Sequence, residues 1–162
     1  MKTIIGIDPG ASGAVSFTSI KDKQIHTYKC HPNITGRAIT IDIAINDFPR
    51  ETVVAYIEKV HAMPHDGRSS LFKFGVNYGA WLGILASKQI RTVEVSPQKW
   101  MKFWQDKIEE KFPKVKKDRK NKLKEIASIY TEKPATLWNA DAVLITMYGV
   151  HKEEEIKNDN RR

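Results

Sequence analysis

The 162-residue sequence predicts an α/β fold with a five-stranded mixed sheet, three antiparallel strands followed by two parallel ones, and helices on both faces. A β-branched run at residues 4–7, followed by two short and partly alternating segments, is typical of three consecutive antiparallel strands. The nearly continuous apolar run at residues 52–57 is typical of a buried strand with parallel neighbours. A parallel connection needs a crossover of about a dozen residues, usually a helix, and helical patterns lie on both sides of this run.

The N-terminal strands are bounded by turn signals. The first ends at Asp8, because the turn dipeptide Pro9-Gly10 follows it. Residues 36–47 fit both a strand and a helix, and the need to reach a parallel neighbour favours the helix. The first three strands are predicted at residues 4–7, 13–17 and 24–28, with a polar hairpin turn at residues 21–23.

A long helix beginning at Ser69 carries three glycines spaced four residues apart, Gly75, Gly79 and Gly83. Glycine inside a helix costs nearly 1 kcal/mol relative to alanine, so this spacing indicates close packing of the helix backbone. The neighbour is either the sheet or a second subunit, and we favour the sheet.

The C-terminal half alternates between one strand and several helices. Residues 91–95 form the last predicted strand, and Ser96-Pro97 is a helix start with proline just inside the cap. That helix ends near Pro113, and a basic segment follows at residues 111–124. A final helix is predicted over residues 137–150. We expect one domain at residues 1–150 and a polar, flexible tail at residues 151–162.

Composition narrows the class of protein. No stretch reaches the roughly 18 apolar residues that a membrane helix needs, and the N-terminus has no signal-peptide pattern, so we expect a cytoplasmic protein, in the host cytoplasm if it comes from a phage. Cys30 is the only cysteine, which excludes an internal disulfide and a Cys/His zinc site. The net charge of +8 favours a polyanionic partner, and nucleic acid is the first candidate.

Three carboxylates stand where a site would form. Asp8 and Glu58 each end an apolar strand, and the carboxyl ends of parallel strands are where open α/β sheets bind ligands. Asp141 interrupts the apolar face of the last helix, where a charge needs a partner or a metal. Two simpler interpretations remain: Asp8 as a turn residue, and Asp141 as a first-turn acid behind an Asn139 cap.

If the three carboxylates meet, they repel one another unless one is protonated or a divalent cation lies between them. Oxygen ligands without cysteine or clustered histidine select Mg²⁺, with Mn²⁺ as a substitute, over zinc. Beside a basic surface, such a cluster is suited to two-metal phosphodiester hydrolysis.

Three motifs together resemble the RuvC family of Holliday-junction resolvases, which have a ribonuclease H-like fold. They are GIDPGASGA at residues 6–14, AYIEKV at residues 55–60 and NADAVLI at residues 139–145. The likeness extends over nearly the whole chain in the same order of elements, and the small size resembles a bacteriophage or viral member. GIDPG also resembles the phosphate loop of sugar kinases and actin-like ATPases, but those need a second lobe that this chain lacks.

The resemblance implies that Asp8, Glu58 and Asp141 are metal ligands and catalytic residues. The family's fourth ligand position is Trp138 here, which cannot bind a metal, so Asn139 and Asp118 are substitute candidates. The family's aromatic wedge, which sits at the junction centre, corresponds to His61, with Met63 nearby.

The basic segment has a functional and a structural interpretation. Its cations track phosphates near the site, and Lys117, Arg119 or Lys120 stabilises charge on the cleaved phosphate; the alternative is a solvated surface. Arg68 and Ser69 could hold a phosphate at a helix N-terminus. Trp100 and Trp104 are predicted in the core. The further DNA-binding candidates are Lys114, Lys116 and Lys122.

The sequence therefore predicts a Mg²⁺-dependent crossover junction endodeoxyribonuclease. We expect a homodimer that cleaves Holliday junctions and other branched DNA in recombination, repair or phage DNA processing, without a membrane or a small-molecule cofactor. Two alternatives are a ribonuclease H-like nuclease acting on flaps, forks or structured RNA, and a non-catalytic module that binds branched DNA.

Overall fold

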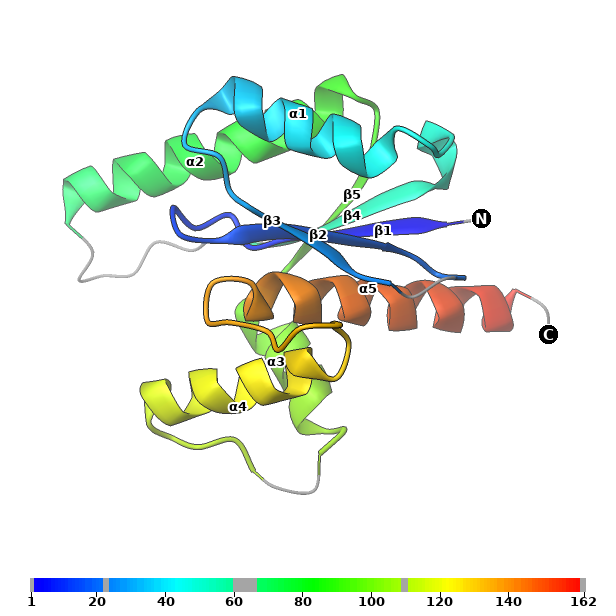
Figure 1. The fold of residues 1–162 in the computed structure, drawn as a ribbon. Coiled ribbons are helices and arrows are strands. Elements are labelled where there is room, and N and C mark those ends of the chain that lie inside the picture. The colour runs from blue at the N-terminus through cyan, green and yellow to red at the C-terminus, as the bar shows by residue number, and fades with distance from the viewer. Residues whose placement is uncertain (1, 22–23, 60–66, 109–110, 161–162) are drawn as a thin grey trace.

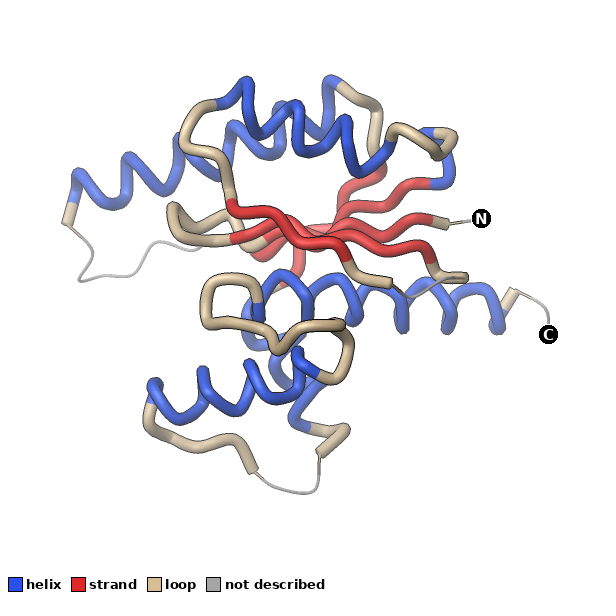
Figure 2. Tube along the Cα trace, in the orientation of Figure 1, coloured by secondary structure: helices blue, strands red, loops and turns tan. Residues whose placement is uncertain are grey.

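The computed structural model describes residues 2–21, 24–59, 67–108 and 111–160, and within them a mixed sheet lies between two layers of helices (Figures 1 and 2). The sheet has five strands in the order β3-β2-β1-β4-β5. β2 pairs antiparallel with β1 and β3, whereas β4 pairs parallel with β1 and β5, so the predicted mixed sheet is confirmed. The strands are β1 (Thr3–Ile7), β2 (Ala14–Ser19), β3 (His26–Lys29), β4 (Val53–Glu58) and β5 (Arg91–Val95).

The helices cover both faces of the sheet. α1 and α2 lie on one face, and α3, α4 and α5 lie on the other (Figure 1). The crossover predicted at residues 36–47 is helical, and the Asn33 side chain caps it by accepting a hydrogen bond from Gly36 N at 2.8 Å. The helices are α1 (Ile34–Ile45), a 3₁₀ turn η1 (Arg50–Thr52), α2 (Arg68–Ser87), α3 (Pro97–Gln105), α4 (Lys116–Ser128) and α5 (Ala140–Asp159).

Two hydrophobic clusters fill the space on either side of the sheet. β1 contributes to both, because alternate isoleucines face opposite layers and all are fully buried. Gly6 allows α5 to approach β1 closely, since a Cβ at this position would collide with Thr146 and with the Ala142 carbonyl. Ser16 fixes the same contact by donating a hydrogen bond to Ala142 O at 2.8 Å. α5 is thus held tightly under the central strands.

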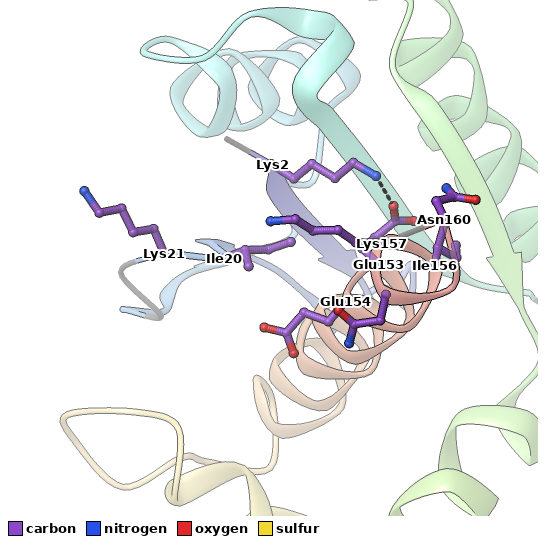
Figure 3. Close-up of a pocket in the computed structure, with 9 residues that line it drawn as sticks. Lys2, Ile20, Lys21, Glu153, Glu154, Ile156, Lys157 and Asn160 are labelled. Atoms are coloured by element: carbon purple, nitrogen blue, oxygen red, sulfur yellow. Dashed lines mark hydrogen bonds and ion pairs between the residues drawn. The ribbon is translucent and has the colours of Figure 1, made fainter. Parts of the chain in front are cut away.

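The C-terminal helix is longer than the sequence predicts. α5 continues to Asp159, so the segment expected to be a flexible tail is helical over most of its length. The reason is Glu153, whose side chain is fully buried and accepts hydrogen bonds from Lys2 Nζ at 2.6 Å and Tyr56 OH at 2.9 Å. Arg91 forms a second ion pair with the same carboxylate. Figure 3 shows Lys2 meeting Glu153 at one side of a surface pocket.

The glycine-bearing face of α2 does not pack on the sheet, and that prediction is wrong. Among the residues that the structure describes, and apart from the backbone of α2 itself and the chain neighbours of each glycine, a Cβ added at any of the three glycines would have no neighbour within 4 Å. The face that meets the sheet instead carries Trp81 and Leu85, both fully buried. On the outward face the glycines are accompanied by Phe72 and Val76, which are 73% and 53% exposed. The outward glycines are Gly75, Gly79 and Gly83.

Helix bounds around the basic segment also differ from expectation. α3 ends at Gln105 rather than near Pro113, and α4 begins at Lys116, so most of the basic segment is helical. The hairpin turn predicted at residues 21–23 falls partly on residues 22–23, which lie outside the described residues. No helix in the described part of the chain is long and apolar enough to span a membrane.

Candidate active site

The three predicted carboxylates lie together at one edge of the sheet. Asp8 directly follows β1, and Glu58 is the last residue of β4, the parallel neighbour of β1. Asp141 is the second residue of α5, which packs against β1. Burial raises the pKa of all three carboxyls, and the charge of Asp141 also raises the pKa of Asp8 and Glu58. The side chains are therefore within electrostatic range of one another.

Asp8 is both a turn residue and a member of this cluster. Its Oδ1 accepts a hydrogen bond from Gly10 N at 3.0 Å, and its backbone N–H donates to Ala14 O at 3.0 Å. Burial raises the pKa of Asp8, and the hydrogen bond from Gly10 N–H lowers it. The charge of Asp141 raises this pKa by a smaller amount, and the charge of Lys120 lowers it. The turn thus fixes the carboxylate at the strand end and leaves Oδ2 for another partner.

Glu58 has the most strongly shifted carboxyl of the three. Burial, followed by the charge of Asp8, raises its pKa from 4.5 to about 7. The shift would be larger without Trp100, whose indole N–H donates to Glu58 Oε1 at 3.0 Å. At neutral pH a substantial fraction of Glu58 therefore carries a proton.

Lys120 supplies the positive charge of the cluster. Its ammonium lies 3.6 Å from Asp141 Oδ2, and the Asp141 side chain is 19% exposed. Burial raises the pKa of Asp141, whereas the nearby positive charge of Lys120 lowers it. The same ammonium lowers the pKa of Asp8 and Glu58, so one cation partly balances three buried acids.

The donor chemistry of this cluster fits a hard divalent cation. Among the described residues, no group of three histidine, cysteine, aspartate or glutamate side chains is arranged closely enough to hold a metal ion. Asp8, Glu58 and Asp141 nevertheless supply only oxygen donors, and their ionisation is disfavoured by burial without a sufficient counter-charge. A cation at this edge would relieve that cost, with Mg²⁺ and Mn²⁺ preferred over zinc.

The two substitute ligand candidates have other surroundings. Asn139 Oδ1 accepts hydrogen bonds from Thr136 N at 2.7 Å and Thr136 Oγ1 at 3.1 Å, which occupies both of its lone pairs. Asp118 is exposed in the first turn of α4 and is not among the charges that shift the pKa of the three clustered acids. Trp138 is half-buried, and Lys29 Nζ lies 5.4 Å from its ring centroid. This arrangement does not favour Asn139 or Asp118 as a ligand.

The other predicted DNA contacts are spread around the cluster. Lys114, Lys116 and Lys117 are exposed at or before the start of α4, and Arg119 donates to Lys114 O at 3.4 Å. Lys122 forms an ion pair with a glutamate three residues further along α4. Arg68 and Ser69 are exposed in the first turn of α2. His61 and Met63 lie outside the described residues.

Three residues contact the cluster or the turn that follows Asp8 without any signal in the sequence. Trp100 is in the core as predicted, at 1% exposure, but the sequence does not indicate its hydrogen bond to Glu58. Asn77 on α2 donates to the Pro9 carbonyl, and the Cys30 thiol donates to Asp8 O at 3.3 Å. Each is distant along the chain from the residue it contacts, so no local spacing predicts the pair.

Comparison with known proteins places the fold. No family model and no curated protein matches the sequence. Among solved structures, Thermus thermophilus RuvC in complex with Holliday junction substrate matches over 95% of this chain and 96% of that chain, with a TM-score of 0.59 and 14% identity. Another structure of Thermus thermophilus RuvC matches over 94% of this chain and 96% of that chain, with a TM-score of 0.60 and 14% identity.

The protein thus has a ribonuclease H-like fold. Within that class its architecture is RuvC-like, since the likeness to Thermus RuvC covers nearly the full length of both chains. At 14% identity the likeness concerns the fold, so the chemistry has to be argued from this chain's own residues.

Proposed function

We propose that the protein is a Mg²⁺-dependent endonuclease that cleaves Holliday junctions and other branched DNA. The observation that carries this proposal is the convergence of Asp8, Glu58 and Asp141 at one sheet edge, with Lys120 beside them, on a RuvC-like fold. Buried carboxylates with raised pKa values are costly to the protein, and a binding role gives a physical reason for keeping them.

Asp8, Glu58 and Asp141 would hold the cation. When bound, a divalent cation lowers the pKa of a ligated water and stabilises negative charge on a phosphate. Hydrolysis forms a bond from the water oxygen to phosphorus and breaks the bond from phosphorus to the sugar oxygen, which then takes up a proton. Glu58 would give up its proton on becoming a ligand, because only the ionised carboxylate binds a metal well. Lys120, whose ammonium lies 3.6 Å from Asp141 Oδ2, would stabilise charge on the attacked phosphate.

DNA is the proposed substrate because of charge and surface placement. The chain carries a net charge of +8, and exposed lysines gather at the start of α4, the helix that contributes Lys120 to the cluster. One of the similar structures is RuvC in complex with a Holliday junction, which supports a four-way junction as the first substrate to test.

A homodimer is proposed through the outward face of α2. Exposed glycines in a helix interior are unfavourable in a monomer, whereas they permit close helix approach in a dimer. The substitution Gly79→Ala distinguishes a dimer that packs through α2 from a monomer. We expect a larger dimer dissociation constant in sedimentation equilibrium, whereas a purely monomeric protein would only gain about 1 kcal/mol of stability from the better helix former.

Cleavage of a synthetic four-way junction tests the function directly. Asp8→Ala should retain junction binding and lose Mg²⁺-dependent cleavage, whereas Asp42→Ala, which removes an exposed carboxylate on α1, should leave both intact. Unchanged cleavage by Asp8→Ala would refute the proposed site. Faster cleavage of flaps, forks or structured RNA would reassign the substrate, and junction binding without any cleavage would indicate a non-catalytic module.

A further inference from the structure

Trp100 links the hydrophobic core to the acidic cluster. It lies on α3 at 1% exposure, and its indole N–H donates to Glu58 Oε1 at 3.0 Å. The backbone leads it there, because β4 and β5 end in register with Glu58 opposite Val95. α3 then begins immediately, fixed by the Ser96 side chain, which accepts from Lys99 N at 3.3 Å.

The two core tryptophans of α3 donate their indole N–H groups to different kinds of partner. Trp104, also at 1% exposure, donates its indole N–H to a backbone carbonyl, Leu144 O, at 3.1 Å. Trp100 instead uses its only donor on a carboxylate at the sheet edge. A neutral N–H donor can fix the position of a carboxylate and leave its negative charge in place. A lysine or arginine at the same position would neutralise that charge.

Glutamate needs such a restraint more than aspartate does. Its carboxylate has one more rotatable bond, and each side chain that must be immobilised on binding lowers affinity. With Oε1 held by Trp100, the orientation of the Glu58 carboxylate is set and Oε2 remains available to a cation. Asp8 is restrained in a comparable way, since its Oδ1 is held by Gly10 N. In both cases one oxygen is anchored by a neutral N–H.

We propose that Trp100 is a positioning residue that orients the Glu58 carboxylate for binding a divalent cation at the acidic cluster. This inference rests on the proposed function, because it assigns Trp100 a role toward the same cation. Hydrogen-bond partners of metal ligands typically change metal affinity or activity by about 10–100-fold when removed.

Phenylalanine at Trp100 or at Trp104 provides a matched test. Both substitutions remove one buried indole N–H from α3 and leave an aromatic ring in the core. Calorimetric titration with Mg²⁺ and with Mn²⁺ should show that Trp100→Phe weakens binding about tenfold. Trp104→Phe should lower thermal stability but keep the affinity within about twofold of the wild type, since its carbonyl partner is not a ligand.

The outcomes separate the inference from the proposed function. Equal losses of affinity in the two variants would overturn the positioning role and leave the nuclease proposal standing. A wild-type protein that binds neither cation would overturn the proposed function and the role of Trp100 together. The contact itself is tested without metal: the indole N–H resonance of Trp100 should shift in Glu58→Ala and that of Trp104 should not. An unmoved Trp100 resonance would also overturn the inference.

Discussion

Replacing Glu153 with glutamine should destabilise the protein without affecting the acidic cluster. Glu153 is fully buried near the start of β1, where its carboxylate joins Lys2, Tyr56 and Arg91. Asp8 follows the opposite end of the same strand. Glutamine preserves the shape of the side chain, but its amide cannot neutralise two cations, and its NH₂ group is a donor facing other donors.

The size of the effect follows from the exposure of the partners. Removing one member of a buried ion pair typically costs about 3–5 kcal/mol. The side chains of Lys2 and Arg91 are 44% and 52% exposed, so they regain water when the carboxylate is lost. We therefore expect Glu153→Gln to lower the free energy of unfolding by about 3 kcal/mol, the lower end of this range. For a chain of this size, that loss corresponds to a decrease of about 6–12 °C in melting temperature.

The destabilisation should depend on pH. Burial alone would raise the pKa of Glu153, but hydrogen bonds from Lys2 and Tyr56 and the charge of Arg91 outweigh it, so the pKa lies below 4.5. A lowered pKa means that the stabilisation is present above about pH 4.5 and is lost as the pH falls through the folded value. The difference between wild type and Glu153→Gln should therefore be full at pH 7 and shrink below about pH 4.5.

Urea denaturation followed by tryptophan fluorescence measures this difference at each pH. Glu155→Gln is the matched control, because Glu155 pairs with Lys152 at 2.6 Å on the same helix but is 55% exposed, so its loss should cost less than about 1 kcal/mol. A cost for Glu153→Gln no larger than that of the control would refute the reasoning. A difference that stays constant down to low pH would show that the cost comes from packing rather than from charge.

Three further predictions concern the acidic cluster and the core. Asp8→Asn should raise the stability of the metal-free protein by about 1–3 kcal/mol, because it removes one of the mutually repelling carboxylates. It should also abolish the rise in melting temperature that Mg²⁺ causes in the wild type. A variant less stable than the wild type in EDTA would contradict this. Since the pKa of Glu58 is about 7, Mg²⁺ binding should release a proton at pH 6 and almost none at pH 8.5. Calorimetric titration in buffers of different ionisation enthalpy measures this proton release. Equal release at the two pH values would contradict the prediction. Trp81 Nε1 is buried without a hydrogen-bond partner among the described residues, so Trp81→Phe should cost about 1 kcal/mol less than Trp104→Phe in urea denaturation.

The sheet and the acidic edge were predictable because both depend on local patterns. The apolar runs before Asp8 and Glu58 identify central strands, and parallel strands bring their carboxyl ends to the same edge. The crossover helix was predictable for the same reason, since two parallel strands leave few alternatives. The metal-ligand roles stay predictions, and so do the roles assigned to Asn139, Asp118 and the basic side chains.

Errors arose where burial depended on distant residues. The segment after Val150 is rich in charge and resembles a solvated tail, but Glu153 is 151 residues from Lys2 and 62 from Arg91 along the chain. No residue near Glu153 in the sequence indicates that its carboxylate will bind two cations and a tyrosine hydroxyl in the folded protein. The tertiary contacts of Glu153 therefore stabilise the turns of α5 beyond Val150.

The sequence by itself determined the order of strands and helices and the position of three carboxylates at strand and helix ends, because periodicity and turn residues act over a few positions. Only the tertiary structure decided which face of α2 is left outward, which lysine of the basic segment reaches Asp141, and that Trp100 bonds Glu58. A helical pattern states which side chains share a face, but packing decides what that face meets.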